Sequence, residues 1–454
     1  MKFFYFFSSL FFALIPISQN IRGFHLGVDI SYCIIVCWSL LAIFFSDRPS
    51  FSMYKIYYTF VLFFFGIAPY IQYSNAVKMW GGLVTFRSED YFFTNLVILF
   101  IMTLFEFFYK GLSKTKQKLI KGHANLPEFK SYQIKLKTKL LLLIFSVASF
   151  AFTLILFNGN IAAMFYRGGM LDEQIEFNPL SQIVFNICRP FSLIVFMVYY
   201  NNVKRLDIFS IIFLAIGLLA NFPTGFARYN AAALYIPFTL VVFPFFRKGA
   251  RFNILMIFGL LIVFPFLDNF RYAIDEDFGG FNLSYAMFEE GHFDTYSSLM
   301  RVMKFDIITY GRQLLGVIFV WVPRSLWSNK PIGSGAFMSK QLDLNLDNIS
   351  MNFFAEGYIN FGFFGILLFV LFLSYFCAKL DNIYSTYSRA GRFYNKHFEV
   401  FYFIFTGFLI FILRGDLLSA FAYVCGYSVS FYIVYKIIMR NEHKVRRVKK
   451  LVIW

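Results

Sequence analysis

Residues 353–378 read FFAEGYINFGFFGILLFVLFLSYFCA, a stretch in which Glu356 is the one charged side chain. A transmembrane helix needs about 20 largely apolar residues, because each residue advances a helix by about 1.5 Å and the hydrocarbon core is about 30 Å thick. The stretch is therefore predicted to cross a membrane. Comparable runs occur at 3–18, 27–46, 55–77, 92–109, 138–157, 180–200, 206–221, 231–246, 252–267, 398–414 and 417–439. Together the runs predict about 12 transmembrane helices.

The composition excludes a water-soluble fold. Hydrophobic residues make up 59% of the chain and charged residues only 15%, whereas soluble domains are roughly 45–50% apolar. Phenylalanine alone fills 68 of the 454 positions, and lipid must cover much of this apolar surface. The predicted fold class is an all-α polytopic membrane protein.

The net charge of +17 comes from lysines and arginines that lie between the apolar runs. We attribute it to the positive-inside rule and not to nucleic-acid binding. The basic segments are Lys2, 47–55, 110–137, 201–205, 247–251, 379–397 and the tail from Lys436. They are predicted to be cytoplasmic, which places both termini in the cytoplasm. The run 3–18 is predicted to be a retained helix and not a cleaved signal peptide, because Gln19-Asn20 follows it where a small-residue cleavage site would be expected. The lysine-rich segment 110–137 is expected to lie against anionic headgroups.

The chain divides into three parts. Residues 1–267 are predicted to form about nine helices, 268–352 a large loop with short helices on the outer side, and 353–454 about three helices with a basic tail. The five cysteines lie inside or at the ends of apolar runs, where they pack as small hydrophobes. They therefore predict neither a disulfide framework nor a zinc site.

Residues 289–294, Glu-Glu-Gly-His-Phe-Asp, form the first candidate site in this loop. Asp294 precedes a helical pattern, so its carboxylate either caps that helix by accepting from first-turn amides or acts as a general base. His292 and Glu290 are alternative bases. Gly291 interrupts any helical i,i+4 face, so no metal site is predicted here.

A second candidate lies at 323–335, PRSLWSNKPIGSG, where prolines and glycines predict an irregular backbone. The preceding residues 313–322 are apolar but half the length of a span, which is typical of an interfacial or re-entrant segment. Arg324 and Lys330 offer donors suited to a diphosphate or a lipid headgroup, and Trp327 a flat face suited to a sugar ring. The alternative interpretation is an interfacial tryptophan with snorkelling cations.

Cations also lie at the outer ends of predicted helices. Arg228 has no acid within its short turn, whereas Arg414 is expected to be neutralised by Asp416 at a hairpin. Together with Arg271, Arg312, Arg324 and Lys330 in the loop, Arg228 could line an outward-facing basic pocket.

Glu356 and Asn360 lie one turn apart at the outer start of the helix at 353. The acid either stabilises the positive end of the helix or, with the amide, binds sugar hydroxyls. Gly357 and Gly365 would allow close packing at this point.

Several of these segments resemble the Wzy-type O-antigen polysaccharide polymerases over roughly residues 220 to 365. The matching segments are Asn221-Phe-Pro-Thr with Arg228, Gly291-His-Phe-Asp294, Pro323 to Gly335, Asn348-Ile-Ser350 and Phe354 to Gly362. The stretch PRSLW-x-x-KPIG is the most specific of them. Elsewhere the resemblance rests on length, hydropathy and phenylalanine content.

The resemblance implies a GT-C-like glycosyltransferase of the bacterial inner membrane that joins undecaprenyl-diphosphate-linked repeat units on the periplasmic face. The loop at 268–352 would then be periplasmic. Such enzymes are expected to use no nucleotide sugar, no metal and no other cofactor. Their partners would be the lipid-linked oligosaccharide, membrane lipid, a chain-length regulator and a flippase.

In this interpretation preorganised cations stabilise the leaving diphosphate, and a base takes the proton of the acceptor hydroxyl. The cations are Arg228, Arg271, Arg324 and Lys330, with Arg312 and Arg414 as further candidates. The candidate bases are Asp294, Glu356 and His292. The side chains expected to bind sugars are Trp327 and Asn360. An O-antigen ligase and a lipid-linked oligosaccharide flippase or other transporter are the alternatives, although transporters usually show internal repeats and mid-membrane charges.

Overall fold

The computed structural model describes residues 22–80, 85–120, 134–165, 179–225, 227–263, 285–344, 346, 349–389 and 396–442. Throughout these ranges the regular structure is helical and contains no strand, which confirms the all-α class. The predicted first span at 3–18 and the candidate residue Arg271 lie outside the described residues.

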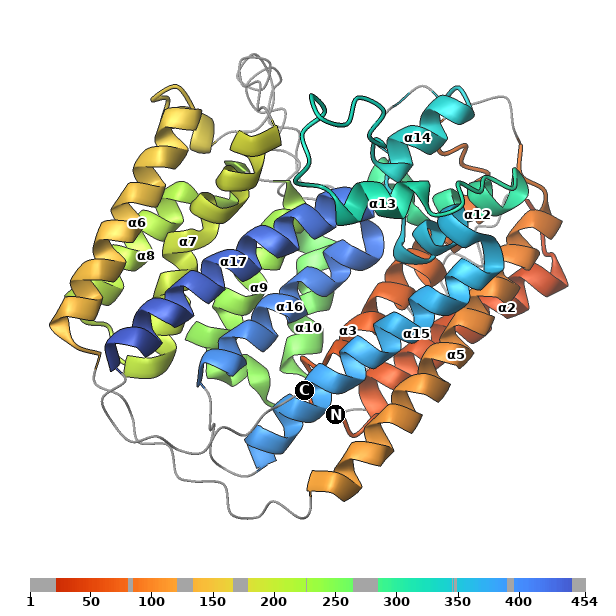
Figure 1. Ribbon diagram of the computed structural model, residues 1–454. Coiled ribbons are helices and arrows are strands. Elements are labelled where there is room, and N and C mark those ends of the chain that lie inside the picture. Colours follow the sequence, from red (N-terminus) through yellow and green to blue (C-terminus); the bar gives the residue numbers. More distant parts are fainter. Residues whose placement is uncertain are drawn as a thin grey trace.

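Eight described helices are long and apolar enough to cross a membrane, so the chain has the helix pattern of a polytopic membrane protein (Figure 1). They are Leu26–Phe45, Met53–Ser74, Ser88–Ser113, Leu136–Leu156, Ser181–Val203, Phe353–Thr386, Lys396–Arg414 and Leu417–Arg440. Each corresponds to one predicted run. The runs at 206–221, 231–246 and 252–267 form shorter helices, so the expected total of 12 stays a prediction.

The long helices overlap the predicted apolar runs, and α5 and α15 extend beyond theirs. The longer elements are α2 (Leu26–Phe45), α3 (Met53–Phe60), η2 (Val61–Ile67), α4 (Ala68–Ser74), α5 (Ser88–Ile120), α6 (Leu136–Leu156), α7 (Pro179–Val203), α8 (Ile208–Ala220), α9 (Arg228–Val242), α10 (Arg251–Phe258), α12 (Thr295–Lys304), α13 (Arg312–Ile318), α14 (Ser334–Gln341), α15 (Phe353–Arg389), α16 (Lys396–Arg414) and α17 (Leu417–Glu442). The short turns are η3 (Ala162–Met164), η5 (Pro223–Gly225), η6 (Pro244–Arg247), η7 (Gly259–Val263), η8 (Tyr285–Glu289) and η9 (Gly291–Phe293).

The helix formed by α3, η2 and α4 is buried along its whole length. Residues 60–71 are apolar or aromatic on every side, which is the pattern of a helix enclosed by others. Around it, α15 packs against α5, α16 against α9, and α17 against α7. Small residues allow two of these crossings: a Cβ at Gly407 would lie 2.5 Å from the Ala233 carbonyl oxygen, and one at Gly426 would lie 2.6 Å from that of Asn186.

Helix α15 is broken near its start and is not one straight span. Phe361 and Gly362 leave the helical conformation, and Gly362 has φ 62°, which favours glycine. The short segment before the break folds against the helix after it, because a Cβ at Gly357 would lie 2.8 Å from the carbonyl oxygen of Gly365. The close packing predicted at these two glycines is confirmed, and it holds Glu356 in a short helix of its own.

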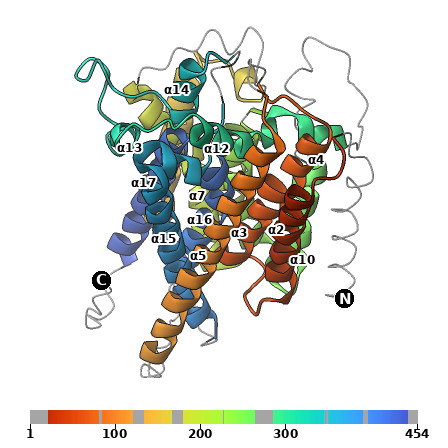
Figure 2. The same ribbon diagram turned by 90° about the vertical axis from the view of Figure 1, so that its right-hand side faces the viewer.

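The elements η8, η9, α12, α13 and α14 cover one end of the helical bundle, which we call the loop end (Figures 1 and 2). They come from the segment predicted as the large outer loop. Residues 313–322 form α13 and the turn after it, with Leu315, Phe319 and Trp321 exposed. The C-terminal ends of α5 and α15 lie at the opposite end (Figure 1).

Candidate functional site

The segment 288–294 is anchored at the loop end by the buried central helix. The Gln72 side chain donates to the carbonyl oxygens of Phe288, at 2.7 Å, and Phe293, at 3.1 Å. The rings of Phe288 and Phe293 pack 5.0 Å apart. Gly291 lies directly against the Trp80 ring, so a larger residue would displace this turn. The backbone on either side of His292 is therefore fixed.

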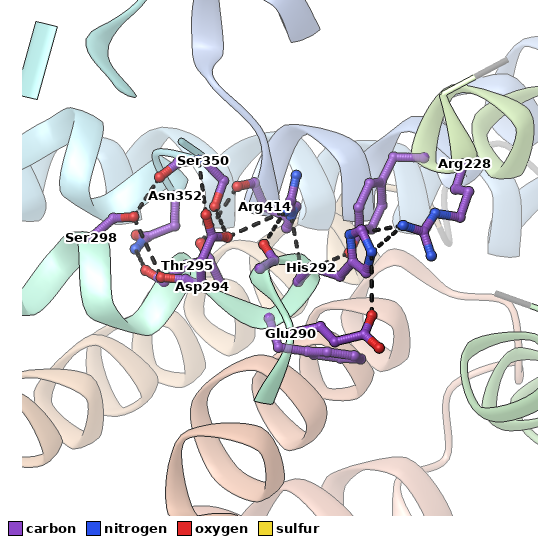
Figure 3. A network of polar contacts seen from close by, with 12 residues as sticks. Arg228, Glu290, His292, Asp294, Thr295, Ser298, Ser350, Asn352 and Arg414 are labelled. Carbon is purple, nitrogen blue, oxygen red and sulfur yellow. Dashed lines mark hydrogen bonds and ion pairs between the residues drawn. The ribbon is translucent and has the colours of Figure 1, made fainter. Parts of the chain in front are cut away.

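His292 lies between a cation and an anion (Figure 3). The Arg228 Nη2 atom is 2.9 Å from its Nδ1 and also contacts its Nε2, and the Glu290 carboxylate is 3.5 Å from Nε2. The Tyr229 hydroxyl donates to the His292 carbonyl at 3.0 Å. The His292 side chain is 22% exposed, so an approaching molecule can reach it.

Asp294 is fully buried. Its carboxylate accepts from the Ser350 amide at 3.1 Å, from the Ser350 hydroxyl, and from Arg414 Nη2 at 3.2 Å. Burial raises the pKa of this carboxyl, and the Arg414 guanidinium opposes that rise. The expectation that Asp294 caps the following helix through its side chain is wrong: it stands at the N-cap position of α12, but the carboxylate makes no capping hydrogen bond.

Arg414, the last residue of α16, holds the same turn from the other side. Besides its pairing with Asp294, it donates to the carbonyl oxygens of Gly291, at 3.1 Å, and His292, at 3.3 Å. Its guanidinium lies 4.5 Å from the centre of the Tyr229 ring. The expected neutralisation of Arg414 by Asp416 is wrong, because the closer acid in space is Asp294 on a distant segment. Arg228, His292, Asp294 and Arg414 thus form one group, here called the His292 cluster.

Asp416 instead joins a second group of polar contacts. Its carboxylate accepts from the backbone amides of Gly335, at 3.1 Å, and Leu418, at 2.9 Å, and burial raises its pKa. Glu356 is fully buried and accepts from the Ser334 hydroxyl at 2.7 Å and the Leu417 amide at 3.0 Å. The two acids therefore tie the start of α14 to the 414–416 hairpin, next to the His292 cluster.

The cations of the 323–335 segment bond to their own loop. Arg324 is exposed and donates to the carbonyl oxygens of Lys330, at 2.8 Å, and Pro331. Lys330 is buried and donates to the carbonyls of Val320 and Val322, and burial lowers its pKa. Arg312, also exposed, reaches the Asn329 carbonyl at 3.3 Å. None of these described contacts brings them to Arg228.

The two expected sugar-binding side chains differ in their surroundings. Trp327 is partly exposed, with its ring 6.5 Å from that of Phe319. Asn360 is fully buried, accepts from the Leu314 amide at 2.8 Å and donates to the Glu356 carbonyl at 2.9 Å. Its amide therefore connects α13 to α15.

The structure adds residues that sequence reasoning did not select. Ser350 supplies two donors to Asp294, and Tyr229 contacts both His292 and Arg414. Ser350 belongs to the Asn348-Ile-Ser350 motif and Tyr229 follows Arg228, so both residues lie in or next to segments that the sequence had already indicated. Neither side chain carries a charge, and a partner 56 residues away along the chain is not visible in the sequence.

Across the described ranges, no group of three or more His, Cys, Asp and Glu side chains is placed to hold a metal ion. No protein-family model matches this chain, and neither a curated protein nor a solved structure matches it.

Proposed function

We propose that this protein is a glycosyltransferase that polymerises lipid-linked oligosaccharide repeat units at the loop end. The observation that carries the proposal is the His292 cluster, in which two arginines from distant helices meet one partly exposed histidine. Arginine suits a diphosphate because its guanidinium fork matches the geometry of phosphate oxygens. The charge distribution along the chain predicts that this end faces the periplasm.

The reaction requires one bond to form and one to break. The acceptor hydroxyl oxygen attacks the anomeric carbon of the donor sugar, and the bond from that carbon to the undecaprenyl diphosphate breaks. The diphosphate leaves with the electron pair, and the hydroxyl proton passes to a base. Arg228 and Arg414 would stabilise the charge that develops on the leaving group.

His292 is the best placed of the three candidate bases. Asp294 and Glu356 are both fully buried and already accept hydrogen bonds from the protein, whereas His292 is partly exposed. When a diphosphate binds the guanidinium of Arg228 in place of His292, one of the two imidazole nitrogens that Arg228 contacts can accept a proton. Glu290 would orient the ring, while Asp294 would act as a positioning residue that holds Arg414.

Deleting the gene and separating the surface polysaccharide on a gel tests the function. A polymerase mutant is expected to retain one repeat unit on the lipid core and to lose the ladder. Loss of every unit would favour a ligase or a flippase and overturn the proposal. A chain-length regulator is the expected partner, and its removal should change the ladder's length distribution without abolishing the ladder.

A further inference from the structure

A cavity of about 410 Å³ lies at the end of the bundle opposite the His292 cluster. It is bounded by the end of α2, the start of α3, the η6–α10 connection, the end of α15 and part of α16. The basic connections 47–55 and 247–251 both contribute, so the charge pattern predicts a cytoplasmic location. Its polar lining includes Arg48, Lys55, Arg247, Ser46, Ser50 and Ser52.

The two buried acids near this cavity already have donors. Asp381 accepts from the backbone amides of Met53 and Tyr54 and from two tyrosine hydroxyls, at 2.6 to 3.2 Å. Glu399 pairs with Arg247 Nη1 at 2.6 Å and accepts from Asn201 at 2.9 Å. Asp47 also lines the cavity but is exposed to solvent. Asp381 and Glu399 thus leave little capacity for further donors.

Several donors around the cavity, in contrast, are not used. Within the described part of the chain, Arg247 Nη2 and the hydroxyls of Ser46 and Ser50 are buried without a hydrogen-bond partner. Ser50 is only 2% exposed. A buried donor that lacks an acceptor costs about 1–3 kcal/mol, more for a charged group, so an occupant that supplies acceptor oxygens would stabilise this region.

We propose that this cavity binds a phosphate-bearing anion, either the headgroup of an anionic phospholipid or a soluble phosphate. A phosphate group offers several acceptor oxygens at once, which matches a guanidinium and serine hydroxyls that line one cavity. The apolar side chains of Ile43 and Phe44 also line the cavity and would accommodate the first methylene groups of a lipid's acyl chains. This cavity is separate from the proposed transferase site, so the proposal of an anion-binding site does not depend on the transferase function.

Binding to the full-length protein, purified in a neutral detergent without phosphate, tests the proposal. One experiment titrates inorganic phosphate by calorimetry. The other reconstitutes the protein in phosphatidylcholine nanodiscs with or without phosphatidylglycerol and counts the retained phosphatidylglycerol by native mass spectrometry. Binding in the first experiment identifies a soluble phosphate, and retention in the second identifies a lipid headgroup. Absence of binding in both overturns the proposal.

Two variants and one control assign the binding to this cavity. Arg247→Gln should weaken binding at least about tenfold, because it removes a charge-assisted donor. Ser50→Ala should weaken it by about threefold or more, and it leaves the Arg247–Glu399 pair intact, so it tests the site even if Arg247→Gln folds poorly. Lys248→Gln removes an equal charge from the adjacent exposed position and should bind like the wild type. Equal weakening by Lys248→Gln, or unchanged binding in Ser50→Ala and Arg247→Gln, contradicts the proposal.

Discussion

The His292 cluster and the 323–335 segment both present cations at the loop end, but they use them differently. In the cluster, Arg228 from α9 and Arg414 from α16 converge on η9, which lies far from both in the sequence. In the segment, Arg324 and Lys330 bond to backbone carbonyls no more than ten residues away. The first arrangement gathers charge from distant helices, whereas the second shapes a loop.

This difference shows why a conspicuous cationic motif need not be the anion-binding site. Arg324 and Lys330 must give up backbone contacts before they can bind a ligand, whereas Arg228 contacts the imidazole of a partly exposed histidine and can exchange that partner for another. The 323–335 segment still contributes to the site indirectly, because Ser334 donates to Glu356 and the Gly335 amide donates to Asp416, which lies two residues after Arg414. The following four substitutions test this distinction.

Arg414→Ala is expected to have the largest effect. It leaves the buried Asp294 carboxylate without its cation, and breaking a buried ion pair costs about 3–5 kcal/mol. Polymerisation should fall by more than about a thousandfold, because a phosphate-binding cation is lost as well. The ladder on a gel and the melting temperature of the purified protein measure the two effects. A normal ladder with an unchanged melting temperature would disprove the role of Arg414 in both.

Arg228→Ala should reduce polymerisation by about 100- to 1,000-fold, as expected when one donor to a developing negative charge is removed. Its partner His292 is partly exposed and can be solvated, so the melting temperature should change little. Arg205→Ala, at an exposed site near the opposite end, is the matched control and should keep the full ladder. If Arg228→Ala polymerises normally, the cluster is not the diphosphate site.

His292→Gln should reduce polymerisation by about a hundredfold, the lower end of what a general base contributes. Glutamine retains hydrogen-bonding capacity but cannot take the proton, so a crosslinking lipid-diphosphate probe should still label the variant. Loss of labelling together with activity would indicate that His292 binds substrate and is not the base.

Arg324→Gln should have the smallest effect, no more than about threefold, because substitutions at exposed positions usually change stability within about 0.5 kcal/mol. The measurement is the ladder at equal protein level. If this variant loses the ladder, Arg324 binds the diphosphate, as the sequence motif predicts. The distinction between the His292 cluster and the 323–335 segment would then be wrong.

Fold class could be predicted from the sequence because it depends on local composition. Each run of about 20 apolar residues satisfies its own backbone hydrogen bonds as a helix, whatever surrounds it. The lengths of the helices in the runs 231–246 and 252–267 are harder to predict, because Pro237 lies inside α9 and a π-helical turn at 259–263 follows α10. The break in α15 was also missed, since Gly362 lies within an otherwise continuous apolar run.

The sequence by itself determined that this is an all-helical membrane protein with a polar loop segment, and it selected Arg228, His292, Asp294 and Arg414 as candidates. Only the tertiary structure decided which of the candidates meet. Arg414 pairs with Asp294, 120 residues away, and not with Asp416, two residues away. Helix packing sets these distances, and buried charges take whichever partner the packing places beside them, so proximity along the chain could not reveal the pairing.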